Sequence, residues 1–215
     1  MQSARGREVA LALVLAAVAG SLDAIGFLHL GGYFVSFMSG NTTRMSAEAV
    51  DLRWADAGRA VGLIVLFFVG GVIGALLSRV RDGRVTVLAA STLLVAASAA
   101  LSVMSSAVPP ILGVAVAMGV MNATFLRDGE VSIGLTYMTG TLVKAAQQVG
   151  AALLGGPRWR WVRYLGMWSA LAAGSLLGAL LYVAWGVSAL WPVAAVMAVA
   201  TVAAWRVRKV SSPRN

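Results

Sequence analysis

The chain has 215 residues, of which 60% are hydrophobic and only 12% are charged. Soluble domains carry charge on about a quarter of their residues. This composition excludes an ordinary soluble protein and indicates that most of the chain is surrounded by lipid.

The net charge of +9 does not indicate nucleic-acid binding, because the basic residues lie at the ends of apolar stretches. They form four groups: Arg5 and Arg7; Arg79, Arg81 and Arg84; Arg158, Arg160 and Arg163; Arg206, Arg208 and Lys209. Such groups are typical of the cytoplasmic loops of membrane proteins. We therefore expect the bilayer and a small solute as partners, no nucleic acid, and both termini in the cytoplasm.

The residues give little support to an enzyme. The chain has no cysteine and a single histidine, His29. These counts exclude thiolate metal sites, two-histidine metal sites and Cys–His pairs. No serine lies in a recognisable nucleophile turn. We therefore expect no catalytic site, no metal ion and no cofactor.

Six apolar stretches follow one another, and most approach the ~20 residues that a helix needs to cross a bilayer. They are residues 9–30, 60–78, 85–104, 108–126, 164–187 and 189–205. The first imitates a secretory signal, because basic residues precede an apolar run with small residues at Ala17-Val18-Ala19. The run continues beyond that point, so we predict a retained span.

A polar segment follows the first stretch. Gly31 and Gly32 interrupt the helix, and the β-branched and aromatic residues up to Phe37 favour extended backbone. The run Ser39-Gly40-Asn41-Thr42-Thr43 then supplies residue types that cap helices. Arg44 follows. We predict an extended piece that leads into a helix start.

This pattern occurs twice, which indicates two structural repeats. Phe37-Met38-Ser39-Gly40-Asn41, followed by Arg44, reappears as Tyr137-Met138-Thr139-Gly140-Thr141, followed by Lys144. We predict a single membrane domain, residues 1–215, in which repeat one covers about 9–104 and repeat two about 108–207. A turn containing Pro109 and Pro110 joins the repeats.

Two further pairs belong to the same duplication. Gly70 and Gly74 match Gly174 and Gly178. Glycines at this spacing let helices approach closely, and we expect them to pack one repeat on the other rather than to form a homo-oligomer.

The number of crossings depends on whether segments 31–50 and 133–155 cross the membrane. If neither does, each repeat has three crossings and the second repeat is inverted; if both do, the protein has eight crossings and parallel repeats. The first segment is too polar for a lipid-facing helix, and six crossings place the loop with Arg79, Arg81 and Arg84 in the cytoplasm.

We therefore predict an all-α integral membrane protein with about six transmembrane helices. They form two inverted-topology three-helix repeats, each with a broken or re-entrant motif segment.

Two helix starts that enter from opposite faces would meet near the bilayer midplane. Each presents unpaired N–H groups and a partial positive charge, which favour an anionic group. The predicted solute-binding residues are Ser39, Gly40, Asn41, Thr42, Arg44, Thr139, Gly140, Thr141 and Lys144. The alternative assigns the small residues to helix packing and the two cations to lipid headgroups.

Asp23 and Asn122 occupy equivalent places in the two repeats. An acid in an apolar span is a candidate for proton or ion coupling, although Asn122 cannot titrate. The alternative role for Asp23 is a structural salt bridge to Arg44.

At Asp23-Ala24, at Phe34-Val35-Ser36-Phe37-Met38-Ser39-Gly40-Asn41-Thr42 and again at Met138-Thr139-Gly140-Thr141, the chain resembles a bacterial family. The family is that of the YoaK-like integral membrane proteins, the domain of unknown function 1275. The family's usual Met-Thr-Gly-Asn is here Met38-Ser39-Gly40-Asn41. The resemblance implies a multi-pass protein of the bacterial inner membrane with six or so helices, and no established substrate.

The predicted function is a small secondary transporter of a polar or anionic solute, in which one repeat rocks against the other. The alternatives are a passive channel on a similar frame, which could be a homo-oligomer, and a non-transporting membrane scaffold.

Overall fold

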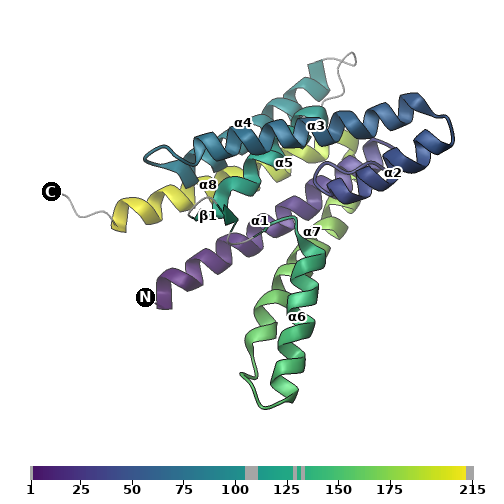
Figure 1. The fold of residues 1–215 in the computed structure, drawn as a ribbon. Helices are drawn as coiled ribbons and strands as arrows, with labels where there is room; N and C mark the ends of the chain where they lie inside the picture. The colour runs from purple at the N-terminus through teal and green to yellow at the C-terminus, as the bar shows by residue number, and fades with distance from the viewer. Residues whose placement is uncertain (1, 105–110, 128–129, 132–133, 212–215) are drawn as a thin grey trace.

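The computed structural model describes residues 2–104, 111–127, 130–131 and 134–211, and their fold is almost entirely helical (Figure 1). The first half contains α1 (Gln2–His29), α2 (Met38–Val50), α3 (Trp54–Leu77) and α4 (Gly83–Met104). The second half contains α5 (Ile111–Met121), α6 (Met138–Leu153), α7 (Arg160–Trp185) and α8 (Leu190–Ser211). Helices therefore occupy all six predicted apolar stretches, and the predicted turn at Pro109 and Pro110 lies outside the described residues.

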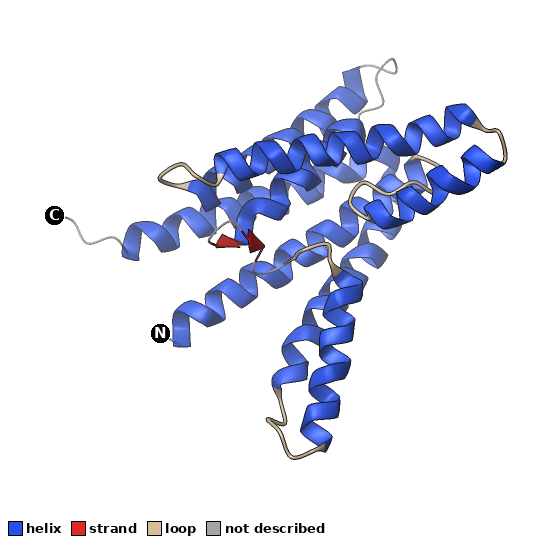
Figure 2. Ribbon diagram, viewed as in Figure 1, coloured by secondary structure: helices blue, strands red, loops and turns tan. Residues whose placement is uncertain are grey.

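The second half departs from the prediction after α5. The expected span over 108–126 ends as an α-helix at Met121 and continues as the 3-10 helix η1 (Asn122–Phe125). Two short strands, β1 (Leu126–Arg127) and β2 (Glu130–Val131), then pair antiparallel (Figure 2). The fold of the described residues is helical as predicted, and this small ribbon of two-residue strands is a local departure from the expected helix.

Four helical stretches are long and apolar enough to cross a membrane by length and composition: Gly6–His29, Trp54–Leu77, Gly83–Val103 and Arg160–Val207. The last has 48 residues and is interrupted by the 3-10 helix η2 (Gly186–Ala189). At 1.5 Å per residue it is roughly twice as long as the ~30 Å hydrocarbon core. It is therefore long enough for two crossings, α7 and α8.

The outward faces of these helices are apolar. Phe68 on α3, Val183 on α7 and Val199 on α8 are each at least 70% exposed. A soluble monomer rarely exposes such extended apolar surface. Lipid contact accounts for it.

The two halves are interlocked, because the first helix of each half packs on the third helix of the other. Helix α1 lies along α7, and α5 lies along α3. Ser21 on α1 donates a hydrogen bond from Oγ to the carbonyl oxygen of Gly174 on α7 at 2.8 Å. The core between the halves includes the fully buried Leu22 and Met118.

Glycines make this close packing possible, and they do so in the same way in both halves. A Cβ on any of the four glycines would overlap the backbone of the facing helix: Gly174 faces Ala17, Gly178 faces Ser21, Gly70 faces Val116 and Gly74 faces Val120. The prediction that these glycines pack one half against the other is confirmed.

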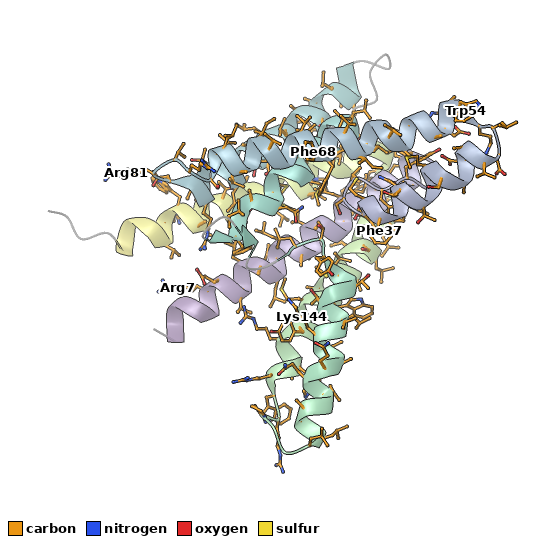
Figure 3. All side chains as sticks on the ribbon, viewed as in Figure 1. Arg7, Phe37, Trp54, Phe68, Arg81 and Lys144 are labelled. Atoms are coloured by element: carbon orange, nitrogen blue, oxygen red, sulfur yellow. The ribbon has the colours of Figure 1, made fainter. Side chains whose placement is uncertain are left out.

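The N-terminal part of α1 lies at one end of the molecule, together with the loop between α3 and α4 and the end of α8 (Figure 1). Glu8 on α1 and Arg84 on α4 form an ion pair of 3.1 Å, and Arg7 and Arg81 both lie at this end (Figure 3). The loop after α2 projects to the right in the same view, and the loop after α6 projects downward.

Candidate functional site

The first motif segment forms the broken element that the sequence predicts. Gly31 and Gly32 adopt φ values of 68° and 101°, a region that favours glycine because it lacks a Cβ. The chain then stays irregular until α2 begins at Met38.

The second segment enters α6 with nearly the same backbone. Tyr137 has φ −86° and ψ 64°, against −88° and 74° for Phe37. The first N–H of each helix bonds two residues back: Met38 to Ser36 at 3.1 Å, and Met138 to Thr136 at 3.0 Å. The two helix starts therefore have the same backbone geometry.

The predicted capping role of the polar run is wrong. Ser39, Thr42 and Thr43 lie inside α2, and the hydroxyls of Thr42 and Thr43 donate to carbonyl oxygens of the preceding turn at 2.9 and 3.1 Å. Asn41 turns back to the irregular segment, where its side chain donates to the carbonyl oxygen of Phe34 at 2.7 Å and accepts from its N–H at 2.9 Å. The amide of Asn41 therefore satisfies backbone that the break leaves unpaired.

The motif glycines make room for aromatic rings. A Cβ on Gly40 would overlap the ring of Phe37, and a Cβ on Gly140 would overlap the ring of Tyr137. Thr139 lies beside Gly140 in the first turn of α6 and is exposed.

Asp23 also holds the first break in place. Its carboxylate accepts hydrogen bonds from the N–H groups of Val35 and Ser36 at 2.9 and 2.8 Å, and from the Ser36 hydroxyl. In the second half Asn122 accepts from the hydroxyl of Thr136 at 3.2 Å. The two residues thus have equivalent roles. Asp23 bonds α1 to the first motif segment, and Asn122 bonds η1 to the second.

The alternative salt bridge between Asp23 and Arg44 is wrong, because Arg44 pairs with a different acid. Its Nη2 and Nε donate to Glu48 Oε1 at 2.9 and 3.2 Å. Its Nη1 donates to the carbonyl oxygen of Gly32 at 2.7 Å, and its guanidinium lies 4.1 Å from the ring centre of Tyr33.

Glu48 completes this network in the first half. Tyr33 donates its hydroxyl to Glu48 Oε1 at 2.8 Å, and the Glu48 side chain is only 2% exposed. Burial alone raises the pKa of Glu48, but the hydrogen bonds from Tyr33 and Arg44 outweigh it and hold the pKa below its ordinary value. In the first motif, the cation Arg44 is therefore already paired with the carboxylate of Glu48.

The second motif instead borders an open pocket. The cavity has a volume of about 240 Å³ and lies between α1 of the first half and the α6–α7 pair of the second. Its lining residues are Val9 and Ala12 of α1, Gly134, Thr141 and Lys144 of the motif segment and α6, and Arg163, Tyr164 and Met167 of α7.

The pocket is cationic. Lys144 and Arg163 both line it, and none of the described residues that line it is acidic. Within the described part of the chain, no carboxylate forms an ion pair with either of them. Two positive charges at a partly enclosed cavity favour an anionic ligand.

Only two of the nine predicted solute-binding residues, Thr141 and Lys144, line this pocket. Thr139 and Gly140 lie in the first turn of α6, and the predicted residues of the first motif, all on α2, do not line it. Helix α2 packs mainly on α3 and α6 mainly on α7.

Sequence reasoning missed the role of Arg163, which it treated only as a cytoplasmic flanking charge. The sequence did contain a sign that Arg163 belongs to the repeated pattern, because it matches Arg59 in the duplication. The position of Val9 and Ala12 at the pocket could not be found, because it depends on how α1 crosses the other half.

Comparisons with known proteins agree with this helical membrane architecture. The profile of a family described as "Protein of unknown function (DUF1275)" matches residues 11–203. A UPF0700 transmembrane protein of Rhizobium meliloti (strain 1021) is 34% identical over 208 residues, which cover 94% of this chain and 89% of that protein.

The chain belongs to the DUF1275 family. The resemblance drawn from the duplicated motif is therefore confirmed. No solved structure matches this DUF1275 protein.

Proposed function

We propose that this DUF1275 protein is a small secondary transporter of an anionic solute in the bacterial inner membrane. The observation that carries the proposal is the pocket lined by Lys144 and Arg163. It lies between a helix of the first half and two helices of the second, which is where solute sites of repeat-built transporters lie.

The interlocked helices support two inverted repeats with six crossings. The glycine contacts of Gly70 and Gly174 are equivalent, as a two-fold relation between the halves requires. The ion pair of Glu8 with Arg84 places the N-terminal part of α1 beside the start of α4, as an even number of crossings between them, α1 and α3, requires. In this arrangement both termini and the loop containing Arg81 are cytoplasmic.

Movement of the halves would alter access to the site. Val9 and Ala12 belong to one wall of the pocket, and Lys144 and Arg163 belong to the opposite walls. Rocking of α1 relative to the α6–α7 pair would therefore open the pocket on one side of the membrane and close it on the other.

The first prediction concerns uptake by proteoliposomes that contain the purified protein. Lys144→Gln and Arg163→Gln each remove one pocket charge, and a charge-assisted hydrogen bond contributes about 1.5–3 kcal/mol. We expect each variant to lower saturable uptake of a radiolabelled organic anion about tenfold or more.

Arg59→Gln is the matched control, because Arg59 is the first-half counterpart of Arg163 and pairs with Asp56 on an exposed surface. We expect it to keep wild-type uptake. Unchanged uptake in both pocket variants would argue against the pocket as the solute site. Uptake that does not saturate would identify a passive channel, and no uptake of any solute would favour a scaffold.

A further inference from the structure

The two halves place a cation at the same position of equivalent helices. Arg44 on α2 and Lys144 on α6 lie equally far from the helix starts at Met38 and Met138. The backbones at these starts share the bond of Met38 to Ser36 with that of Met138 to Thr136, so the two cations can be compared directly. One helical turn further on, the first half has Glu48 and the second has Gln148.

The first half shows what this cation binds. The carboxylate of Glu48 accepts two hydrogen bonds from Arg44, at 2.9 and 3.2 Å, and one from Tyr33 at 2.8 Å. Residues at i and i+4 share a helix face, which brings this carboxylate to the cation. The partner of Arg44 is thus a carboxylate that is almost fully buried.

The second half lacks that carboxylate. Gln148 is a neutral amide, and the described lining of the pocket holds the cations Lys144 and Arg163 and no acid. In the first half the cation is paired with a carboxylate of its own helix, whereas in the second half the equivalent cation lines an open cavity whose described residues carry surplus positive charge.

We infer that the second-half pocket binds the carboxylate group of a small solute, which pairs with Lys144 as the carboxylate of Glu48 pairs with Arg44 in the first half. This inference rests on the function proposed above, because it assigns the ligand of the same pocket. Val9, Ala12 and Met167 make part of the lining apolar, so the proposed solute is a monocarboxylate with a short apolar body. Lys144 and Arg163 neutralise its charge.

The test is carboxylate binding to the purified full-length protein in detergent. Isothermal titration calorimetry with butyrate is compared with butyramide, which has nearly the same shape and no charge. We expect butyrate to bind at least tenfold more tightly than butyramide to the wild-type protein. Equal binding of the two compounds, or phosphate binding that is tighter than butyrate binding, would overturn the inference.

The matched variants introduce a carboxylate into α6 at two places. Gln148→Glu places it one turn from Lys144, where it reproduces the pairing of Glu48 with Arg44, and we expect butyrate affinity to fall at least tenfold. Ala146→Glu adds the same charge two residues from Lys144, on a different face of α6, and we expect affinity close to wild type. Wild-type butyrate affinity in a folded Gln148→Glu protein would contradict the inference. If this variant does not fold, the comparison of butyrate with butyramide on the wild-type protein still tests the inference.

Binding and transport give separate readouts. Butyrate binding without butyrate uptake by proteoliposomes would keep the carboxylate assignment and remove the transport function. Saturable uptake of a phosphate ester without butyrate binding would keep transport and remove the carboxylate assignment.

Discussion

The charge of Glu48 depends on three side chains that surround it. Arg44 and Tyr33 bond to Oε1, and Arg53 lies 3.9 Å from the same oxygen. Glu48 Oε2 is buried and has no hydrogen-bond partner among the described residues. A carboxylate in this position depends strongly on its nearest cation, because a buried charge that loses its partner is costly.

We predict that Arg44→Met destabilises the protein more than Glu48→Gln does. The first variant leaves the buried carboxylate with the hydrogen bond from Tyr33 and, as its cation, only the more distant Arg53, whereas the second removes the charge itself and keeps a similar shape. Arg44 is 33% exposed, so we expect a loss of about 2 kcal/mol for Arg44→Met.

That loss corresponds to a fall in Tm of roughly 4–8 °C for a protein of this length, measured by thermal unfolding in detergent. Glu48→Gln is the paired measurement. A larger fall for Glu48→Gln than for Arg44→Met would contradict the described network.

Individual residues were only partly predictable from the sequence. The pair of Arg44 and Glu48 has the i, i+4 spacing that helices favour, so it could have been found once α2 was predicted. The hydrogen bonds of Asp23 could not, because they go to backbone N–H groups of an irregular segment whose path no spacing rule defines.

Helices are the scale at which the sequence was most informative. Long apolar stretches predicted α1, α3, α4, α7 and α8, since the length of a bilayer-spanning helix is fixed by the hydrocarbon thickness. The ribbon after η1 was not predicted, because strands of two residues leave no hydrophobic period to detect.

Adjacent glycines on α3 give a sharp test of helix packing. A Cβ at Gly70 would overlap the carbonyl group of Val116, whereas a Cβ at Gly71 would meet no atom within 4 Å. We predict that Gly70→Ala lowers Tm by several degrees, because overpacking costs about 1–3 kcal/mol. Gly71→Ala should leave Tm unchanged or raise it slightly, since alanine is the better helix former.

The same comparison extends to the second half. Gly174→Ala should resemble Gly70→Ala, because Gly174 faces the carbonyl group of Ala17 in the equivalent contact. Equal Tm values for Gly70→Ala and Gly71→Ala would show that α3 and α5 do not pack as described.

At the scale of the whole molecule, the sequence predicted two repeats, and the structure shows how the two halves of the chain pack on each other. The spacing of Gly70 and Gly74 indicated a helix contact without naming its partner. Crossing of α1 to α7 and of α5 to α3 supplies that partner. The packing of α1 on α7 also brings Val9 to the pocket. The pocket could therefore not be predicted from the motif alone.

The membrane topology can be tested with single cysteines, since the natural chain has none. In the six-crossing arrangement, Ser3→Cys and Arg81→Cys react with a membrane-impermeant maleimide from one side, and Asp51→Cys reacts from the other. The measurement uses intact cells and inverted vesicles. Labelling of Ser3→Cys and Arg81→Cys from opposite sides would instead indicate eight crossings.

The hydrogen bond between Ser21 and Gly174 joins residues that are 153 positions apart. At a synthesis rate of 5–20 residues per second, the ribosome needs roughly 8 to 30 s to make the second residue after the first. During that interval α1 is inserted in the bilayer without its partner, with Ala17 and Ser21 uncovered. Maturation of the protein therefore waits for its last quarter to be translated, and a nascent chain released before α7 leaves α1 as a substrate for membrane quality control.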